Sequence, residues 1–351
     1  MTRNVAYVGT YTEGDSDSDG IYICEISSDS DQSIQKRESI SVPDNPSFLT
    51  IHPNKNYLYA VHEVEQGGVT AFEIREGGRL RRLNRVESGA GGPCHCSVHP
   101  SGEFLLVAHY TGAAVSVLPI HDGRLEPPSD VVRHFGSSVH PDRQTQAHPH
   151  SVVPSPDGQY LYVADLGTDE IVNYRLNRQS GALEQESVIG VTPGAGPRHL
   201  SFHPSEHYVY AINELESSLT GSEWNAETGS LTEITTESTL PPGFDGSNIA
   251  AEVRVHPSGQ WVYASNRGHH SVAIFEIDQE TGGIRPIGYE PTRGEWPRNF
   301  ALDTDGELLF AENQKSSQIV VFEIDDTSGA LRATGEKISI PDPVCMQVLP
   351  Q

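Results

Sequence analysis

Apolar and polar residues alternate in seven short segments along the chain, and each segment ends on a large apolar residue. Alternation with a period of two predicts a β-strand with one buried face. Successive end points are separated by 48, 46, 56, 48, 53 and 47 residues, and such nearly constant spacing is typical of repeat proteins. The seven end points are Ile26, Ile74, Ile120, Leu176, Trp224, Ile277 and Ile324.

Each repeat contains a hairpin before this strand and a more polar strand after it. In one repeat the hairpin strands are expected at residues 198–202 and 208–213, with a tight turn at His203–Glu206. Glycine-containing turns such as Ser180-Gly181 lead into the fourth strand, because glycine adopts positive φ without strain. Four antiparallel strands in each repeat predict an all-β fold, a seven-bladed β-propeller that spans residues 1–351 as a single domain.

The two ends of the chain complete one repeat between them. Residues 5–11 match the second hairpin strand of the other repeats. Residues 343–350 have two prolines separated by six residues, the frame that marks the first hairpin strand at residues 46–53 and 197–204. We therefore expect one blade to combine N- and C-terminal strands, which closes the ring and removes free sheet edges.

Composition adds information mainly through charge. The chain has 48 acidic and 23 basic residues, a formal net charge of −25. This charge disfavours nucleic acid and anionic membranes as partners. Because salt screens self-repulsion, we expect a halophilic protein, and thermal unfolding measured against KCl concentration tests this expectation. An ordinary acidic protein is the alternative.

Several features point to a soluble protein without bound metal. The chain shows neither a signal peptide nor an apolar run near the ~18 residues of a membrane span, so we expect a cytoplasmic protein, monomeric or weakly dimeric. The four cysteines have no zinc-binding spacing and are expected to be structural thiols. No nucleophile elbow, P-loop or dinucleotide-binding motif occurs, so we expect no metal and no cofactor.

The polar positions gather at one end of the predicted hairpins. Antiparallel pairing brings the start of the first strand and the end of the second to the same mouth of the ring, so Arg198 and Glu214 should be neighbours. Residues at this mouth differ between repeats, whereas interior positions are uniformly apolar. The mouth positions of the first strands are Val344, Ser47, Cys94, His150, Arg198, Ala251 and Arg298, and those of the second strands are Tyr11, Glu63, Tyr110, Leu166, Glu214, Arg267 and Gln314. Insertions at residues 135–147 and 239–248 each precede a first strand, and we expect both to cover the mouth in part.

Four residues on adjacent repeats carry the expected chemistry: His150, Arg198, Glu214 and Arg267. A histidine or carboxylate can act as a general base, and planar, permanently charged guanidiniums can hold an anion. Which of His150 and Glu214 is the base stays open. The further residues expected to bind substrate are His148, His199, Arg298, Glu63, Glu252 and Asn313.

Four His-Pro pairs look like a second set of functional histidines. They fall in the turns between the hairpin strands, at the end of the repeats away from the mouth, and their spacing does not suit a metal. We therefore expect a structural role for all four. The residues are His52, His99, His203 and His256.

Short segments along nearly the whole chain resemble the lactonase family of seven-bladed β-propellers, which includes the propeller type of 6-phosphogluconolactonase. The family is in turn similar to fungal carboxy-cis,cis-muconate lactonizing enzymes. Members often have Asn at the positions of His62 and His109. The matching segments include Val8-Gly-Thr-Tyr-Thr12, Gly92-Pro-Cys-His, His148-Pro-His-Ser, Gly196-Pro-Arg-His, Ser265-Asn-Arg-Gly-His269, Pro297-Arg-Asn-Phe and Ala311-Glu-Asn-Gln.

The resemblance implies a lactone hydrolase that acts without metal on an anionic sugar lactone, such as the 6-phosphogluconolactone of the pentose phosphate pathway. Its motifs assign the active site to His150 (or His148), Arg198, Glu214 and Arg267. Cyclisation of a carboxylated muconate is the alternative reaction. A non-catalytic binding platform is a third possibility, which would favour exposed aromatic and apolar patches at the mouth. Whether the substrate carries phosphate stays open.

Overall fold

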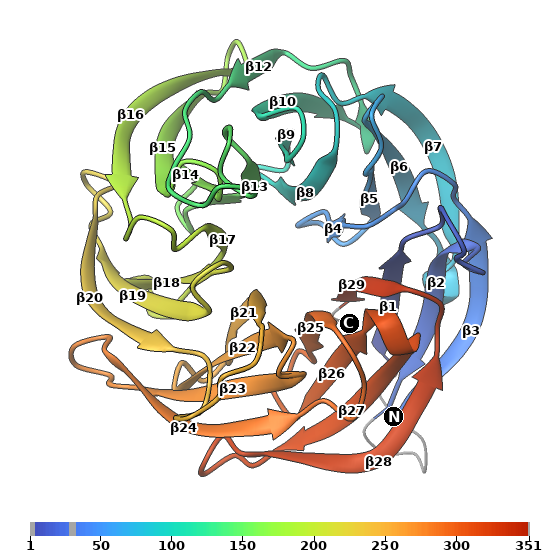
Figure 1. The fold of residues 1–351 in the computed structure, drawn as a ribbon. Helices are drawn as coiled ribbons and strands as arrows, with labels where there is room; N and C mark the ends of the chain where they lie inside the picture. The colour runs from blue at the N-terminus through green and yellow to red at the C-terminus, as the bar shows by residue number, and fades with distance from the viewer. Residues whose placement is uncertain (1–3, 28–32, 350–351) are drawn as a thin grey trace.

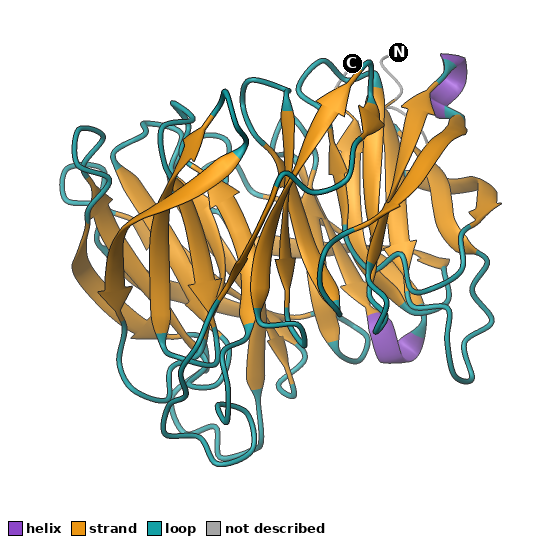
Figure 2. Ribbon diagram, turned by 90° about the horizontal axis from the view of Figure 1, so that it is seen from above, coloured by secondary structure: helices purple, strands orange, loops and turns teal. Residues whose placement is uncertain are grey.

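The computed structural model describes residues 4–27 and 33–349. Its sheets stand like spokes around a common axis (Figure 1), and the turns and loops collect at the two ends of the ring (Figure 2). The described residues form seven antiparallel sheets, six of four strands and one with a short fifth strand. The prediction of a seven-bladed β-propeller is therefore confirmed.

The blades are numbered from the N-terminus, and their strands are listed from the innermost outward. Blade 1 consists of β29 (Pro343–Leu349), β1 (Asn4–Thr10), β2 (Gly20–Ile26) and β3 (Ile34–Ser41). Blade 2 consists of β4 (Leu49–Ile51), β5 (Tyr57–His62), β6 (Gly68–Ile74) and β7 (Leu80–Glu87). Blade 3 consists of β8 (Pro93–Val98), β9 (Phe104–His109) and β10 (Ala114–His121), with β11 (Arg124–Leu125) and β12 (Asp130–Arg133) both paired to β10.

Blades 4 to 7 continue the order of the chain. Blade 4 consists of β13 (Pro149–Pro154), β14 (Leu161–Asp165), β15 (Glu170–Asn177) and β16 (Ala182–Gly190). Blade 5 consists of β17 (Pro197–Phe202), β18 (Tyr208–Asn213), β19 (Ser218–Trp224) and β20 (Leu231–Ser238). Blade 6 consists of β21 (Ile249–Val255), β22 (Trp261–Arg267), β23 (Ser271–Ile277) and β24 (Ile284–Pro291). Blade 7 consists of β25 (Pro297–Leu302), β26 (Leu308–Asn313), β27 (Gln318–Ile324) and β28 (Leu331–Ser339).

Blade 1 joins the two ends of the chain, as expected. The C-terminal strand β29 pairs with the N-terminal strand β1, with Tyr7 opposite Gln347. The ring is thus closed by backbone hydrogen bonds between residues from opposite ends of the sequence. The described helices are two single turns of 3-10 helix, η1 (Glu76–Gly78) and η2 (Gln314–Ser316). None of the helices in the described ranges is long or apolar enough to cross a membrane.

The hydrophobic core lies between neighbouring blades. One cluster joins Tyr210 and Ile212 of blade 5 to Val262 and Phe275 of blade 6, and all four side chains are buried. Each blade therefore buries one face against the next, which is why the alternating strands are apolar on both faces near the axis. Packing between blades fixes the relative positions of residues that are far apart in sequence.

A bulge near the start of the innermost strands determines which side chains face the axis. In blade 5, Pro197 pairs with Asn213 and His199 pairs with Ile212, so Arg198 has no partner between them. Because a bulge breaks the alternation of the strand, two consecutive side chains can point the same way. Blades 3, 4 and 7 have the same shift of register at the same place. The inner strands therefore present two rows of side chains near the axis.

The His-Pro histidines lie at the end of the blades away from these bulges, and each bonds to the following blade. In His203, Nδ1 accepts the backbone N–H of Ser205 at 3.0 Å and Nε2 lies 2.8 Å from the carbonyl oxygen of Gly259. This pattern makes Nε2 the protonated nitrogen that donates to the carbonyl. The equivalent contacts join His52 to Gly102, His99 to Gly158 and His256 to Gly306. The structural role expected for the four residues is confirmed.

Candidate active site

A pocket of about 420 Å³ lies at the mouth where the innermost strands begin and the second strands end. Its lining comes from every blade, and most of it consists of the mouth positions identified from the repeats. Three of the four residues expected to carry the chemistry line it, and the fourth, Arg198, contacts Glu214 without being part of the lining. The lining residues are Tyr11, Glu63, Cys94, Tyr110, Arg143, His150, Glu214, Ile249, Arg267, Trp296, Arg298 and Gln314.

Glu214 is the centre of a buried charge cluster at one side of the pocket. Its Oε2 lies 2.6 Å from Nη2 of Arg267 and 2.9 Å from Nε of Arg198. Its Oε1 lies 2.6 Å from Nη2 of Arg143. Arg198 and Glu214 are neighbours across one hairpin, as the antiparallel pairing predicted. One carboxylate thus holds three guanidiniums from blades 5 and 6 and from the loop before blade 4.

This arrangement fixes the charge of Glu214. Burial by itself raises the pKa of the carboxyl group, but Arg267, Arg198 and Arg143 outweigh burial and hold the pKa well below its usual value. Burial likewise lowers the pKa of Arg198, and the Glu214 carboxylate opposes that effect. Glu214 is therefore a carboxylate whose negative charge is shared among cations, which makes it a weak base.

His150 lies beside this cluster on β13. Its Nε2 is 4.0 Å from Oε2 of Glu214, and its Nδ1 is 3.9 Å from Sγ of Cys94. Burial, followed by the positive charge of Arg198, holds the pKa of His150 well below its usual value. The imidazole is therefore neutral at physiological pH and has a lone pair available. It can accept a proton next to a carboxylate that would stabilise the resulting imidazolium.

The opposite wall contains a second polar group. The hydroxyl of Tyr11 donates to Oε2 of Glu63 at 2.9 Å, and the guanidinium of Arg298 lies over the Tyr11 ring at 5.5 Å from its centroid. Burial lowers the pKa of Arg298, but Tyr11, Glu63 and Glu214 together raise it above its usual value. Within the described ranges no carboxylate is within ion-pair distance of Arg298, in contrast to Arg143, Arg198 and Arg267.

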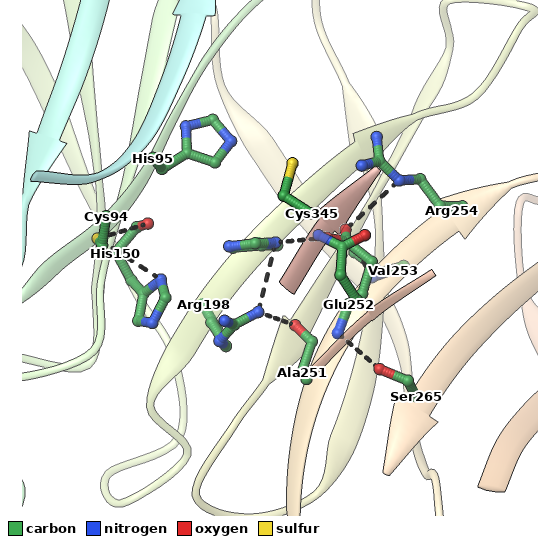
Figure 3. A network of polar contacts seen from close by, with 12 residues as sticks. Cys94, His95, His150, Arg198, Ala251, Glu252, Val253, Arg254, Ser265 and Cys345 are labelled. Atoms are coloured by element: carbon green, nitrogen blue, oxygen red, sulfur yellow. Dashed lines mark hydrogen bonds and ion pairs between the residues drawn. The ribbon is translucent and has the colours of Figure 1, made fainter. Parts of the chain in front are cut away.

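His199 and Glu252, both expected to bind substrate, are not part of the pocket lining. The polar contacts around Glu252 are drawn in Figure 3. Glu252 accepts a hydrogen bond from Asn299 Nδ2 at 2.8 Å and contacts Nδ1 of His199 at 3.1 Å. The ring of His199 packs against His150, His95 and Phe48 from three other blades. The bulge explains the placement, because it turns His199 inward below Arg198.

His148 and Asn313 also lie outside the lining. The imidazole of His148 stacks on Tyr110 with ring centroids 4.2 Å apart, and its Nδ1 lies 2.9 Å from the Tyr110 carbonyl oxygen. Asn313 is fully buried, and its amide donates to the carbonyl oxygen of Thr292 at 3.1 Å. Of the six residues expected to bind substrate, Glu63 and Arg298 line the pocket.

Three lining residues were not indicated by the repeat pattern: Arg143, Ile249 and Trp296. Arg143 belongs to the insertion at residues 135–147, which supports the expectation that this insertion covers the mouth. A basic residue in an acidic chain, within a loop assigned to the mouth, was the available signal. The insertion at residues 239–248 contributes no lining residue. Its Phe244 packs on His269, with ring centroids 4.9 Å apart.

All four cysteines are buried and unpaired, and Cys94 lies at the pocket. In the part of the chain that the structure describes, no three or more His, Cys, Asp and Glu residues are grouped to hold a metal ion.

Comparison with known proteins agrees with this geometry. The family model described as "Lactonase, 7-bladed beta-propeller" matches residues 5–348. The chain is 34% identical to a 6-phosphogluconolactonase of Bacillus subtilis over the full length of both proteins. A 6-phosphogluconolactonase of Formosa agariphila is also 34% identical, over 86% of each chain. The solved structure of a Pseudomonas aeruginosa periplasmic gluconolactonase superposes with a TM-score of 0.93 and 31% identity over 99% of both chains. The protein therefore belongs to the lactonase family of seven-bladed β-propellers.

Proposed function

We propose that this protein hydrolyses a sugar lactone in the pocket at the mouth of the propeller, with His150 as the general base. The observation that carries the proposal is the position of His150. A neutral, buried imidazole lies 4.0 Å from a carboxylate that three guanidiniums keep ionised. The expectation left open two possible bases. The pKa values of both groups lie below their usual values, but three guanidiniums already bind the Glu214 carboxylate, whereas the neutral His150 keeps a lone pair, and this favours the histidine.

The reaction follows from these roles. His150 takes a proton from water as the water oxygen forms a bond to the lactone carbonyl carbon. The Glu214 carboxylate lies beside the imidazole of His150 and stabilises the imidazolium that forms in this step. When the bond between the acyl carbon and the ring oxygen breaks, His150 returns the proton to that oxygen. The products are a hydroxyl group and a carboxylic acid, which releases its proton to solvent.

Arg298 is suited to stabilise the negative charge that develops on the carbonyl oxygen. It occupies the same position on β25 that His150 occupies on β13, so both lie at the same depth in the mouth. No carboxylate within the described ranges neutralises it at ion-pair distance. A charged donor placed where an oxyanion forms is worth most in a site that excludes water. Arg198 and Arg267 bind the Glu214 carboxylate, and their positive charges contribute to the electrostatic potential of the site.

The charge of the pocket favours an anionic lactone, and we propose a phosphorylated one. Arg143, Arg198, Arg267 and Arg298 outnumber the carboxylates Glu63 and Glu214. With His150 neutral, two positive charges remain in excess, in a protein whose net charge is −25. A phosphate monoester carries about −1.5 to −2 at neutral pH and would balance this excess. The relatives named 6-phosphogluconolactonase support the same choice.

The proposal is tested by lactone hydrolysis measured against the spontaneous rate. We expect the protein to accelerate hydrolysis of 6-phosphogluconolactone, with chelator present. His150→Gln should lower kcat/KM by ~10²-fold or more, as loss of a general base does. His203→Gln is the matched control, because it also removes a buried, bonded imidazole but at the far end of blade 5. A rate equal to the spontaneous background, or equal losses in both variants, would contradict the proposal.

We further propose that the protein works in the cytoplasm of a cell with concentrated internal salt. Four buried, unpaired thiols support a reducing compartment. The net charge of −25 supports high ionic strength, where self-repulsion is screened. The temperature of unfolding should then rise with KCl concentration, and a flat or falling curve would count against this proposal.

A further inference from the structure

We propose that Arg143 is a specificity-determining residue that binds the phosphate group of the substrate, an inference that rests on the proposed function. Arg143 lies in the loop between β12 and β13 and lines the pocket. Its Nη2 contacts Oε1 of Glu214 at 2.6 Å and the hydroxyl of Tyr110 at 3.2 Å. Its side chain is 34% exposed, whereas those of Arg198 and Arg267 are 3% exposed.

The groups that would react with the carbonyl and the group that would bind the phosphate lie at different depths in the pocket. His150 and Arg298 come from equivalent positions on the innermost strands, so the reacting carbonyl belongs between them. Arg143 comes from a loop outside the strands and is partly exposed at the entrance. The phosphate of a phosphorylated sugar lactone is carried on a carbon outside the ring. With the carbonyl at His150, the phosphate extends to the entrance, where Arg143 is the charged donor.

Arg143 can bind an anion without leaving Glu214 unpaired. The Glu214 carboxylate keeps Arg198 and Arg267 at its Oε2. A guanidinium has five N–H donors, and the two contacts made by Arg143 both use Nη2. Among the described residues no partner occupies the remaining donors of this guanidinium, which suits them to the planar, two-point recognition of phosphate oxygens that arginine favours. A plain lactone offers no charge to these donors, so Arg143 distinguishes the two substrates.

The loop holds the backbone of Arg143 in place without help from its side chain. Gln144 is fully buried and donates through Nε2 to the carbonyl oxygen of Leu166 at 2.9 Å. His134, at the start of the loop, contacts Oδ2 of Asp165 at 2.8 Å through Nδ1. Changing the Arg143 side chain therefore removes one guanidinium and leaves the loop anchored at both ends.

The experiment compares two substrates and two variants. kcat and KM are measured for 6-phosphogluconolactone and for the unphosphorylated gluconolactone with the wild type, Arg143→Gln and Arg133→Gln. Arg133 is the matched control, because it is an exposed arginine on β12 that donates to the carbonyl oxygen of Gly112 at 2.9 Å and does not line the pocket. Competitive inhibition by inorganic phosphate is measured alongside.

We expect Arg143→Gln to raise KM for the phosphorylated lactone by ~10- to 100-fold, the usual value of a charge-assisted contact, and to weaken inhibition by phosphate. The loss of kcat/KM for the plain lactone should be at least tenfold smaller than the loss for the phosphorylated lactone, because only the contact with Glu214 is lost there, and Arg133→Gln should behave as wild type. Arg143→Lys should recover part of the loss, because it keeps the charge.

Equal losses on both substrates would overturn the inference, because they would mean that Arg143 only positions Glu214. Unchanged kinetics on both substrates would overturn it as well. A wild type that hydrolyses the plain lactone but not the phosphorylated one would also overturn it while leaving lactone hydrolysis intact. A wild type that hydrolyses neither lactone would instead contradict the proposed function, so the two failures are distinguishable.

Discussion

The two ends of the innermost strands use similar residue types for different purposes. At the far end, the four His-Pro histidines make the same contact, each with a glycine carbonyl of the following blade. At the mouth, the second residue of the innermost strand differs between blades: it is Cys94 in blade 3, His150 in blade 4, Arg198 in blade 5 and Arg298 in blade 7. A contact that recurs between several pairs of blades repeats its residue, whereas a site that is made once does not.

The neighbouring glycines show the same repetition. Gly259 has a φ of +73°, and a Cβ at this residue would lie 2.5 Å from Nε2 of His203. The turn therefore needs both the positive φ and the close approach that glycine permits. Gly306 stands in the same relation to His256. Such pairs hold blades together and need no substrate to explain them.

The comparison predicts its largest effect at Glu214. Glu214→Gln leaves three guanidiniums around a neutral amide, and removing one partner of a buried ion pair costs about 3–5 kcal/mol. Burial opposes the ionised carboxylate, but the arginines hold its pKa below the unfolded value. The stabilisation is thus present above the unfolded pKa and is lost as pH falls through the low folded pKa. Urea unfolding at neutral and acid pH measures both effects.

Activity should fall with stability in this variant. Without the carboxylate, the imidazolium of His150 loses its counter-charge, so we expect kcat/KM to fall by ~10²-fold or more at a temperature where the variant stays folded. A matched control is Glu290→Gln, which removes a carboxylate paired with Arg293 on the surface. Wild-type stability and activity in Glu214→Gln would contradict the central role of this carboxylate at the mouth.

The same comparison explains how much the sequence could predict. Spacing and alternation identified seven blades, their hairpins and the closing strands, because these depend on a strand pattern repeated in every blade. The proline frame also located His150, Arg198, Glu214 and Arg267 at one mouth. Repetition carries this information, since seven similar segments constrain each other's register.

Features made only once were harder to predict. Arg143 lies in an insertion without a counterpart in other repeats, so no alignment between repeats could assign its direction. A bulge in blade 5 turns both Arg198 and His199 inward, another shift of register surrounds Glu252 in blade 6, and both His199 and Glu252 lie outside the pocket lining. The side-chain amide of Asn313 donates to a backbone carbonyl oxygen, and the position of Asn313 at the mouth does not by itself predict this contact.

A smaller effect is predicted at the far end. His203→Ala removes the contact with Gly259 and should lower the free energy of unfolding by about 1 kcal/mol, the usual net value of one hydrogen bond. Lactone hydrolysis should keep its wild-type kcat/KM, because the pocket lies at the other end of the blade. Denaturant unfolding and the hydrolysis assay together measure this. A loss of activity larger than threefold in folded protein would break the distinction between the two ends.

The smallest effect is predicted for a departure from the repeat that lies outside the pocket lining. Glu312 stands where other second strands have residues such as Val61 or Ala108, opposite Asn299 in the register of blade 7. It is fully buried, and neither carboxyl oxygen has a hydrogen-bond partner among the described residues. Burial, together with the charge of Glu252, raises its pKa well above the usual value.

The raised pKa of Glu312 makes the stability of the folded protein depend on pH. In the unfolded chain Glu312 ionises above pH ~4.3, whereas in the folded protein it keeps its proton, so stability falls as pH rises through this range. Glu312→Gln cannot ionise and should therefore unfold at a higher temperature than wild type at pH 8, with the difference shrinking toward pH 4. Glu323→Gln, which changes an exposed carboxylate paired with Arg332, is the control. A difference that is constant with pH would contradict the raised pKa of Glu312. A loss of lactone hydrolysis would show that this buried acid serves the site instead of only weakening the fold.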